Sequence, residues 1–204
     1  DYVIQFANLV SPFPNLRVLA PNVRFFVDHH AKGMFAQGNR ERGGELAELR
    51  AWLLARLLWD PSADVERGTD EFLAGFYGPA AGPIRAYLDA VHDALEESGA
   101  PLRIFEGPRN ARETYLTEPL VARYGELFDE AERSVADSPE LLARVREARL
   151  PLQYAQVELG YGDADERRSL IRSFGETARA SGLEKVEEWK LTVEGWVERA
   201  EQGL

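Results

Sequence analysis

The sequence predicts a mainly α-helical fold, in which a C-terminal helical bundle follows the last strand–helix–strand piece of a (β/α) barrel. Three observations lead to this prediction. Short apolar runs bounded by turn residues occur only near the N-terminus. From Gly43 onward apolar residues recur with a period of about 3.6, which is typical of amphipathic helices. Proline and glycine mark the ends of these periodic segments. We therefore assign residues 1–42 to the barrel and 43–204 to a helical domain.

The barrel portion is predicted from the order of its short segments. Residues 2–6 and 33–38 read as strands, and a proline-rich turn and a helix over 22–30 lie between them. This order is what a βαβ unit of a parallel sheet leaves behind when its earlier strands are removed. Because the first strand begins directly after Asp1, we expect the chain to be the C-terminal piece of a longer protein.

The helical domain begins with three predicted helices, each ended by proline or glycine. They cover about residues 46–58, 64–76 and 84–95, where leucines and other apolar residues stripe one face. Asp60-Pro61 ends the first helix, and Gly99 is placed for a left-handed C-terminal cap of the third.

Further helices follow an irregular stretch around residues 101–116. Two start signals combine a hydroxyl residue with proline, at Thr117 and at Ser138-Pro139. Pro151 lies inside the second of these helices, and we expect a kink or break near Glu147 because proline removes one backbone donor. The last two predicted helices include residues 170–178 and 186–196.

Composition and charge exclude several partner classes. The chain has 24 Lys and Arg against 35 Asp and Glu, a formal net charge of −11. Such a surface repels nucleic-acid phosphates and anionic lipids, so neither nucleic acid nor a membrane is an expected partner. No apolar run approaches the roughly 20 residues that span a bilayer. The oligomeric state is left open.

Common catalytic and metal-binding patterns are missing from the sequence. Cysteine is absent, which excludes thiolate ligands, disulfides and cysteine nucleophiles. His29 and His30 are adjacent and point about 100° apart on a helix, while His92 lies on another predicted helix. The chain has no phosphate-binding glycine loop, dinucleotide fingerprint or nucleophile elbow. We expect no metal and no cofactor.

Polar residues near the predicted strand ends form the candidate site. In a (β/α) barrel, ligands bind at the C-terminal ends of the strands, which here follow Phe6 and Phe35. Glu45 lies beside the start of the next helix, a place that suits an anion or a sugar hydroxyl. The candidate substrate-binding residues are Asn8, Gln37, Asn39, Glu41, Arg42 and Glu45. The alternative is that residues 37–44 only form a polar loop and cap between barrel and bundle.

The four tryptophans allow a similar pair of interpretations. A tryptophan can stack on a sugar ring, but all four fall within or beside predicted core stripes, so we interpret them as packing residues. They are Trp52, Trp59, Trp189 and Trp196.

Several segments, taken in order, resemble one bacterial family, which is labelled domain of unknown function 4838. The similarity spans most of residues 1–159 and includes Lys32-Gly33-Met34-Phe35 and Leu57-Leu58-Trp59-Asp60-Pro61. Members of this family look like glycoside hydrolases related to the α-glucuronidases and β-hexosaminidases. The other segments that carry the resemblance are residues 14–16, 22–26, 35–38, 43–52, 72–81, 84–87 and 149–154.

The resemblance implies a longer protein with an N-terminal α/β domain, a catalytic barrel and a C-terminal helical domain. Glycoside hydrolysis needs two carboxyl groups, or one plus a substrate acetamido group, across the scissile bond. The resemblance implies that the catalytic acid lies upstream of Asp1. Ala36 departs from the family, since a carboxylate is expected near that strand end in relatives. Gln37 and Glu45 stay as hydrogen-bonding candidates for sugar hydroxyls.

The resemblance also implies a carbohydrate partner, acid-assisted hydrolysis without a cofactor, and an extracytoplasmic or secreted location. The chain alone is expected to be inactive. The alternative from another class is a non-catalytic helical module for interaction or scaffolding.

Overall fold

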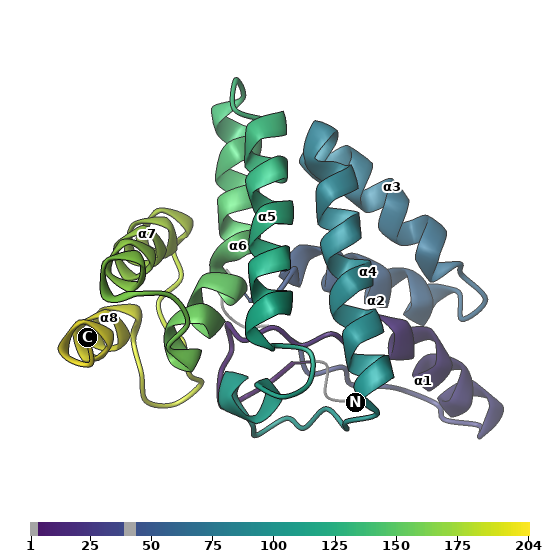
Figure 1. Cartoon of the computed structure of the whole chain (residues 1–204). Coiled ribbons are helices and arrows are strands. Elements are labelled where there is room, and N and C mark those ends of the chain that lie inside the picture. The colour runs from purple at the N-terminus through teal and green to yellow at the C-terminus, as the bar shows by residue number, and fades with distance from the viewer. Residues whose placement is uncertain (1–3, 39–43) are drawn as a thin grey trace.

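The computed structural model describes residues 4–38 and 44–204 and confirms the mainly α-helical fold (Figure 1). In chain order, the helices are α1 (Leu16–Asp28), α2 (Ala47–Trp59), α3 (Val65–Tyr77), α4 (Ala81–Ser98), α5 (Glu118–Ser134), α6 (Pro139–Leu159), α7 (Ala164–Ser181) and α8 (Val193–Gln202), with the short 3-10 helices η1 (Gly78–Ala80) and η2 (Pro108–Ala111). None of these helices is long and apolar enough to cross a bilayer, judged over the described residues.

The two predicted strands do not form in the described part of the chain. Residues 4–6 and 33–38 belong to no sheet. A strand requires a neighbouring strand for its backbone hydrogen bonds, and the N-terminal segment finds loops instead. The Phe6 amide donates to the Ile104 carbonyl and the Leu9 amide to the Val186 carbonyl, both at 2.8 Å. The predicted strands are therefore not seen over 4–6 and 33–38, where Gln37 lies only in an isolated β-bridge.

The N-terminal segment contributes to the core of the helical region. Ile4, Phe6 and Val10 are buried, in the same hydrophobic cluster as Leu49 of α2 and Tyr154 of α6. The predicted division of the chain at residues 42 and 43 falls outside the described residues. The apolar side chains on its two sides share one core.

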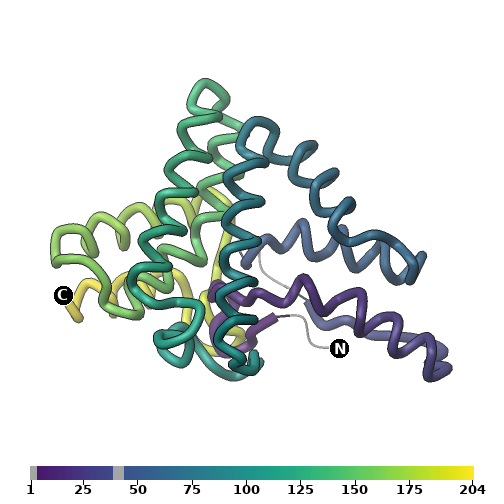
Figure 2. The backbone as a smooth tube through the Cα atoms, turned by 45° about the vertical axis from the view of Figure 1, so that its right-hand side comes forward, coloured from purple at the N-terminus to yellow at the C-terminus, as the bar shows by residue number. Residues whose placement is uncertain are grey.

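Three helices form the centre of the fold. Helices α4, α5 and α6 stand side by side, with α1 to α3 on one side and α7 and α8 on the other (Figures 1 and 2). The Tyr87 ring of α4 lies 5.5 Å from the Tyr124 ring and 4.9 Å from the Phe128 ring of α5. Aromatic pairs at such distances add to the stabilisation by burial.

Most predicted helix ends are close to those of the structure. Helix α2 ends before Asp60-Pro61, and Gly99 adopts the left-handed conformation after α4. Helix α1 begins earlier than predicted and contains Pro21, since its buried face already includes Leu16. Of the kink or break predicted near Glu147, the break does not occur, because α6 continues through Pro151 to Leu159.

The last predicted helix begins too early. Residues 183–192 form an irregular loop with a Lys185–Thr192 bridge, and α8 starts only at Val193, where the Thr192 hydroxyl accepts from the Gly195 amide. Trp189 is consequently 69% exposed. Trp59 is 91% and Trp52 is 41% exposed. Trp196 is fully buried, and Trp52 packs its partly exposed ring 6.2 Å from that of Phe72, so the packing interpretation fails for Trp59 and Trp189.

Candidate functional site

Glu45 lies in a buried polar cluster rather than at an open surface. Glu45 is only 4% exposed. The Phe13 amide donates to Glu45 Oε2 at 2.6 Å, and the Tyr87 hydroxyl donates to Oε1 at 3.0 Å. Arg50 Nη2 lies 3.5 Å from Oε2. Both carboxylate oxygens are therefore occupied by groups of the protein itself.

Arg50 completes this cluster from the first half of α2. Its guanidinium donates to the backbone carbonyl of Glu45 at 2.6 Å, to that of Phe13 at 3.1 Å and to the Asn15 side chain at 3.2 Å. Burial raises the pKa of Glu45, and Arg50, the Phe13 amide and the Tyr87 hydroxyl oppose that rise. A buried ion pair is tolerated when such additional hydrogen bonds satisfy it.

Asn8 has a comparable internal role in another part of the fold. Its Oδ1 accepts from the Tyr154 hydroxyl at 2.5 Å, and its Nδ2 donates to the Glu106 carbonyl at 2.9 Å. These partners are distinct from those of Glu45, so the structure does not join the two residues into one site. Gln37 is half-buried. The remaining candidates, Asn39, Glu41 and Arg42, lie outside the described residues.

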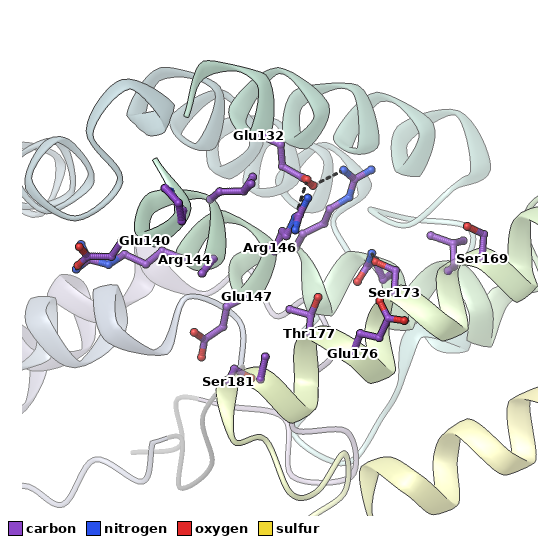
Figure 3. A pocket seen from close by; sticks show the side chains of 17 residues that line it. Glu132, Glu140, Arg144, Arg146, Glu147, Ser169, Ser173, Glu176, Thr177 and Ser181 are labelled. Carbon is purple, nitrogen blue, oxygen red and sulfur yellow. Dashed lines mark hydrogen bonds and ion pairs between the residues drawn. The ribbon is translucent and has the colours of Figure 1, made fainter. Parts of the chain in front are cut away.

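A groove that sequence reasoning missed lies between α6 and α7, with a volume of about 900 Å³ (Figure 3). We call it the α6–α7 groove. The first three quarters of α6 form one wall, α7 forms the other, and Glu132 of α5 closes one side. Its lining residues are Glu132, Pro139, Glu140, Leu142, Ala143, Arg144, Arg146, Glu147, Arg149, Gln153, Ser169, Leu170, Ser173, Glu176, Thr177, Ala180 and Ser181.

The α7 wall carries hydroxyl side chains at intervals of four residues. Residues i and i+4 lie on one face of a helix, so Ser169, Ser173, Thr177 and Ser181 form a row along the groove (Figure 3). The opposite face of α7 buries Ile171, Phe174 and Ala178, which fixes the orientation of the helix. This repeat of four is visible in the sequence and could have indicated the wall.

The arginines of the α6 wall are already paired with carboxylates. Arg149 Nη1 lies 2.7 Å from Asp129 and 2.8 Å from Glu132. Arg146 contacts Glu132 at 3.2 Å. Arg144 contacts Glu140 at 2.5 Å and donates to the Phe76 carbonyl at 2.8 Å. The groove therefore offers no unpaired cation among its lining residues.

Gln153 is the most deeply placed polar group of the groove. The residue is 6% exposed, and its Nε2 donates to the Ser173 hydroxyl at 3.1 Å. Its Oε1 and the neighbouring Arg149 Nε are buried without a hydrogen-bond partner among the described residues. Within the same residues no group of three or more His, Cys, Asp or Glu side chains could hold a metal ion.

Comparison with known families covers the N-terminal part of the chain. Residues 1–89 match the family model described as Domain of unknown function (DUF4838). No curated protein and no solved structure matches the chain significantly. The match ends within α4, so the Glu45 cluster lies inside it, while the α6–α7 groove lies outside it.

Proposed function

We propose that the chain is the helical support portion of a carbohydrate-active, glycoside-hydrolase-like protein and supplies no catalytic acid itself. The match of residues 1–89 supports the family on which this proposal draws. The observation that carries the support role is the inward position of Glu45, whose two oxygens bind Phe13 and Tyr87.

Catalysis by Glu45 conflicts with its surroundings. A catalytic carboxyl group must reach the glycosidic oxygen, the anomeric carbon or the attacking water. Glu45 instead holds the segment before α1 against α4, while Arg50 neutralises it from α2. Its position favours a bracing role over a role in substrate binding.

Enzyme assays on two polypeptides test this proposal. The chain alone and the longest polypeptide that its gene encodes are assayed with aryl β-N-acetylhexosaminides, α-glucuronides and neutral aryl glycosides. We expect hydrolysis by the longer polypeptide and none by the chain. Hydrolysis by the chain alone, or a folded longer polypeptide that neither hydrolyses nor binds any glycan, contradicts the proposal.

A second candidate function is a non-catalytic interaction module, and exposed apolar side chains on α1 and α2 favour it. Phe25 and Val27 of α1 and Leu58 and Trp59 of α2 are all exposed. Exposed apolar patches commonly mark interaction sites. Under this alternative the longer polypeptide hydrolyses no glycoside, and Trp59→Ser weakens association with a protein partner without changing the melting temperature.

A further inference from the structure

We propose that the α6–α7 groove binds a neutral, polyhydroxylated ligand, such as a glycan segment, through Gln153, Arg149 and the hydroxyl row of α7. The proposal is independent of the support role, because the groove lies outside residues 1–89 and shares no residue with the Glu45 cluster. It adds a binding site that neither the family match nor the sequence analysis assigns.

The buried atoms of Gln153 and Arg149 point to a ligand. The Gln153 carbonyl oxygen is an acceptor without a donor, and Arg149 Nε is a donor without an acceptor. A buried polar atom without a partner is unfavourable, because it has lost its hydrogen bonds to water. Both residues line the groove. A molecule that fills the groove and offers both kinds of partner is therefore favoured there.

A hydroxyl group, like a water molecule, can serve both as the donor that Gln153 Oε1 lacks and as the acceptor that Arg149 Nε lacks. It donates one hydrogen bond and accepts through two lone pairs. The row on α7 has the same dual character at Ser169 and Thr177. Ser181 already donates to the Ala178 carbonyl at 3.0 Å, so toward a ligand it only accepts, and Ser173 already accepts from Gln153. At 1.5 Å per residue, the four side chains repeat about every 6 Å and span about 18 Å. Such a row suits an extended ligand with regularly spaced hydroxyls.

The charges of the groove disfavour an anionic ligand. Four glutamates and three arginines line it, a sum of −1. Each arginine already contacts a carboxylate of Glu132, Glu140 or Asp129. A phosphate or uronate would meet no unpaired cation and would be repelled by the surplus carboxylate. The ligand class that remains is neutral and rich in hydroxyls.

Calorimetric titration of the full chain tests the site. The probes are cellohexaose and chitohexaose, with hexagalacturonate as the anionic comparison and an uncharged Ser/Gly dodecapeptide as the comparison for an extended backbone. We expect the neutral hexasaccharides to bind and hexagalacturonate to bind at least tenfold more weakly. Binding of these probes needs no enzyme activity, so its result is separate from that of the hydrolysis assays.

Three variants locate the binding. Gln153→Leu and Thr177→Val keep the shape of the groove wall and are expected to weaken binding of the neutral hexasaccharides about tenfold each, the effect of one hydrogen bond. Gln202→Leu, at the exposed end of α8, is the matched control and should leave binding unchanged. Circular dichroism and melting temperatures verify that each variant folds.

Several outcomes overturn the proposal. Among them are no binding of either hexasaccharide at millimolar concentration, which would indicate that the groove holds water only, and tighter binding of the anionic or peptide probe. Unchanged binding in both folded groove variants would place the sugar elsewhere on the chain. If Gln153→Leu does not fold, Thr177→Val alone decides between these results, because a threonine-to-valine change keeps the side-chain shape.

Discussion

The Tyr87 hydroxyl donates a 3.0 Å hydrogen bond to Oε1 of Glu45, a residue 42 positions earlier in the chain. Because the other oxygen of the same carboxylate accepts from the Phe13 amide, one side chain connects α4 to the segment that precedes α1. Arg50 lies on the same carboxylate and balances its charge inside the core. The cluster therefore makes the N-terminal segment an integral part of the helical fold.

Glu45→Gln is expected to destabilise the chain by about 3 kcal/mol. The substitution keeps the shape of the side chain but leaves the buried Arg50 guanidinium without its counter-charge, and breaking a buried pair in this way costs about 3–5 kcal/mol. Urea unfolding followed by circular dichroism measures the change.

Glu48→Gln is the matched control for this experiment. Glu48 lies two residues into α2 and is exposed. Its replacement should change the free energy of unfolding by less than about 0.5 kcal/mol.

In an active longer polypeptide, Glu45→Gln should lower the melting temperature and leave kcat of the folded enzyme unchanged. A large loss of kcat without loss of stability would assign Glu45 to catalysis and contradict the bracing role.

The stability of the chain should fall as the pH drops below about 6.5 because of His92. The Leu16 amide donates to Nε2 at 3.0 Å, so the neutral ring carries its proton on Nδ1, which donates to the Leu88 carbonyl at 2.7 Å. Burial lowers the pKa of His92 from its ordinary value of 6.5, and Arg17 and Arg50 act in the same direction. As the pH falls, His92 therefore binds a proton in the unfolded chain before it does so in the folded chain, and this protonation favours unfolding.

Urea unfolding of the wild type and of His92→Gln at pH 8 and pH 5.5 measures this contribution. The His92 contribution is fully present above the unfolded pKa and decreases below it, so the wild type should lose more stability between these two pH values than the variant loses. Since other groups titrate in both proteins, the difference between them isolates His92. Equal losses would show that His92 is protonated as easily in the folded state as in the unfolded state.

Asn8→Ala is expected to cost about 1–3 kcal/mol, because the Tyr154 hydroxyl and the Glu106 carbonyl each lose a partner. The position is also coupled to Gly107, where an added Cβ would lie 2.8 Å from Asn8 Nδ2. Gly107→Ala should therefore be destabilising in the wild type and less so in the Asn8→Ala background. Additive costs in this double-mutant cycle would show that the two residues are independent.

The exposed and buried tryptophans should respond very differently to alanine. Trp196 is fully buried, packs 4.5 Å from the Phe174 ring and donates from Nε1 to Glu158 at 2.8 Å. Trp196→Ala should cost about 3–5 kcal/mol. Trp59→Ala should change stability by less than about 0.5 kcal/mol, because the side chain is almost entirely exposed. Denaturant unfolding of both variants compares the costs, and similar values would contradict the observed burial.

Helix positions were the part of the fold most accessible from sequence. The leucine stripe of α2, the left-handed Gly99 and the Ser138-Pro139 start of α6 are local signals, and they are found where expected. A helix satisfies its backbone hydrogen bonds within a few residues of the same segment. Its presence and its apolar face can therefore be predicted without knowledge of the rest of the fold.

The strands and the candidate site depended on partners far away in the chain. Residues 4–6 have the composition of a strand, but the Phe6 amide pairs with Ile104 in a loop. Glu45 has the position expected of a ligand-facing group, but Phe13, Arg50 and Tyr87 surround it. The four-residue interval between Ser169 and Ser173 is likewise visible in the sequence. The sequence does not show that these residues line a groove against α6.

The sequence by itself determined a helical, acidic chain without cysteine and with most helix boundaries in place. Only the tertiary structure decided that Glu45 and Asn8 face inward, that Trp59 faces outward, and that Gln153 meets the hydroxyl row of α7 in a groove. The physical reason is the separation along the sequence over which each interaction acts. Helical hydrogen bonds and periodicity act over a few residues, whereas burial and pairing depend on which distant segments the folded chain brings together.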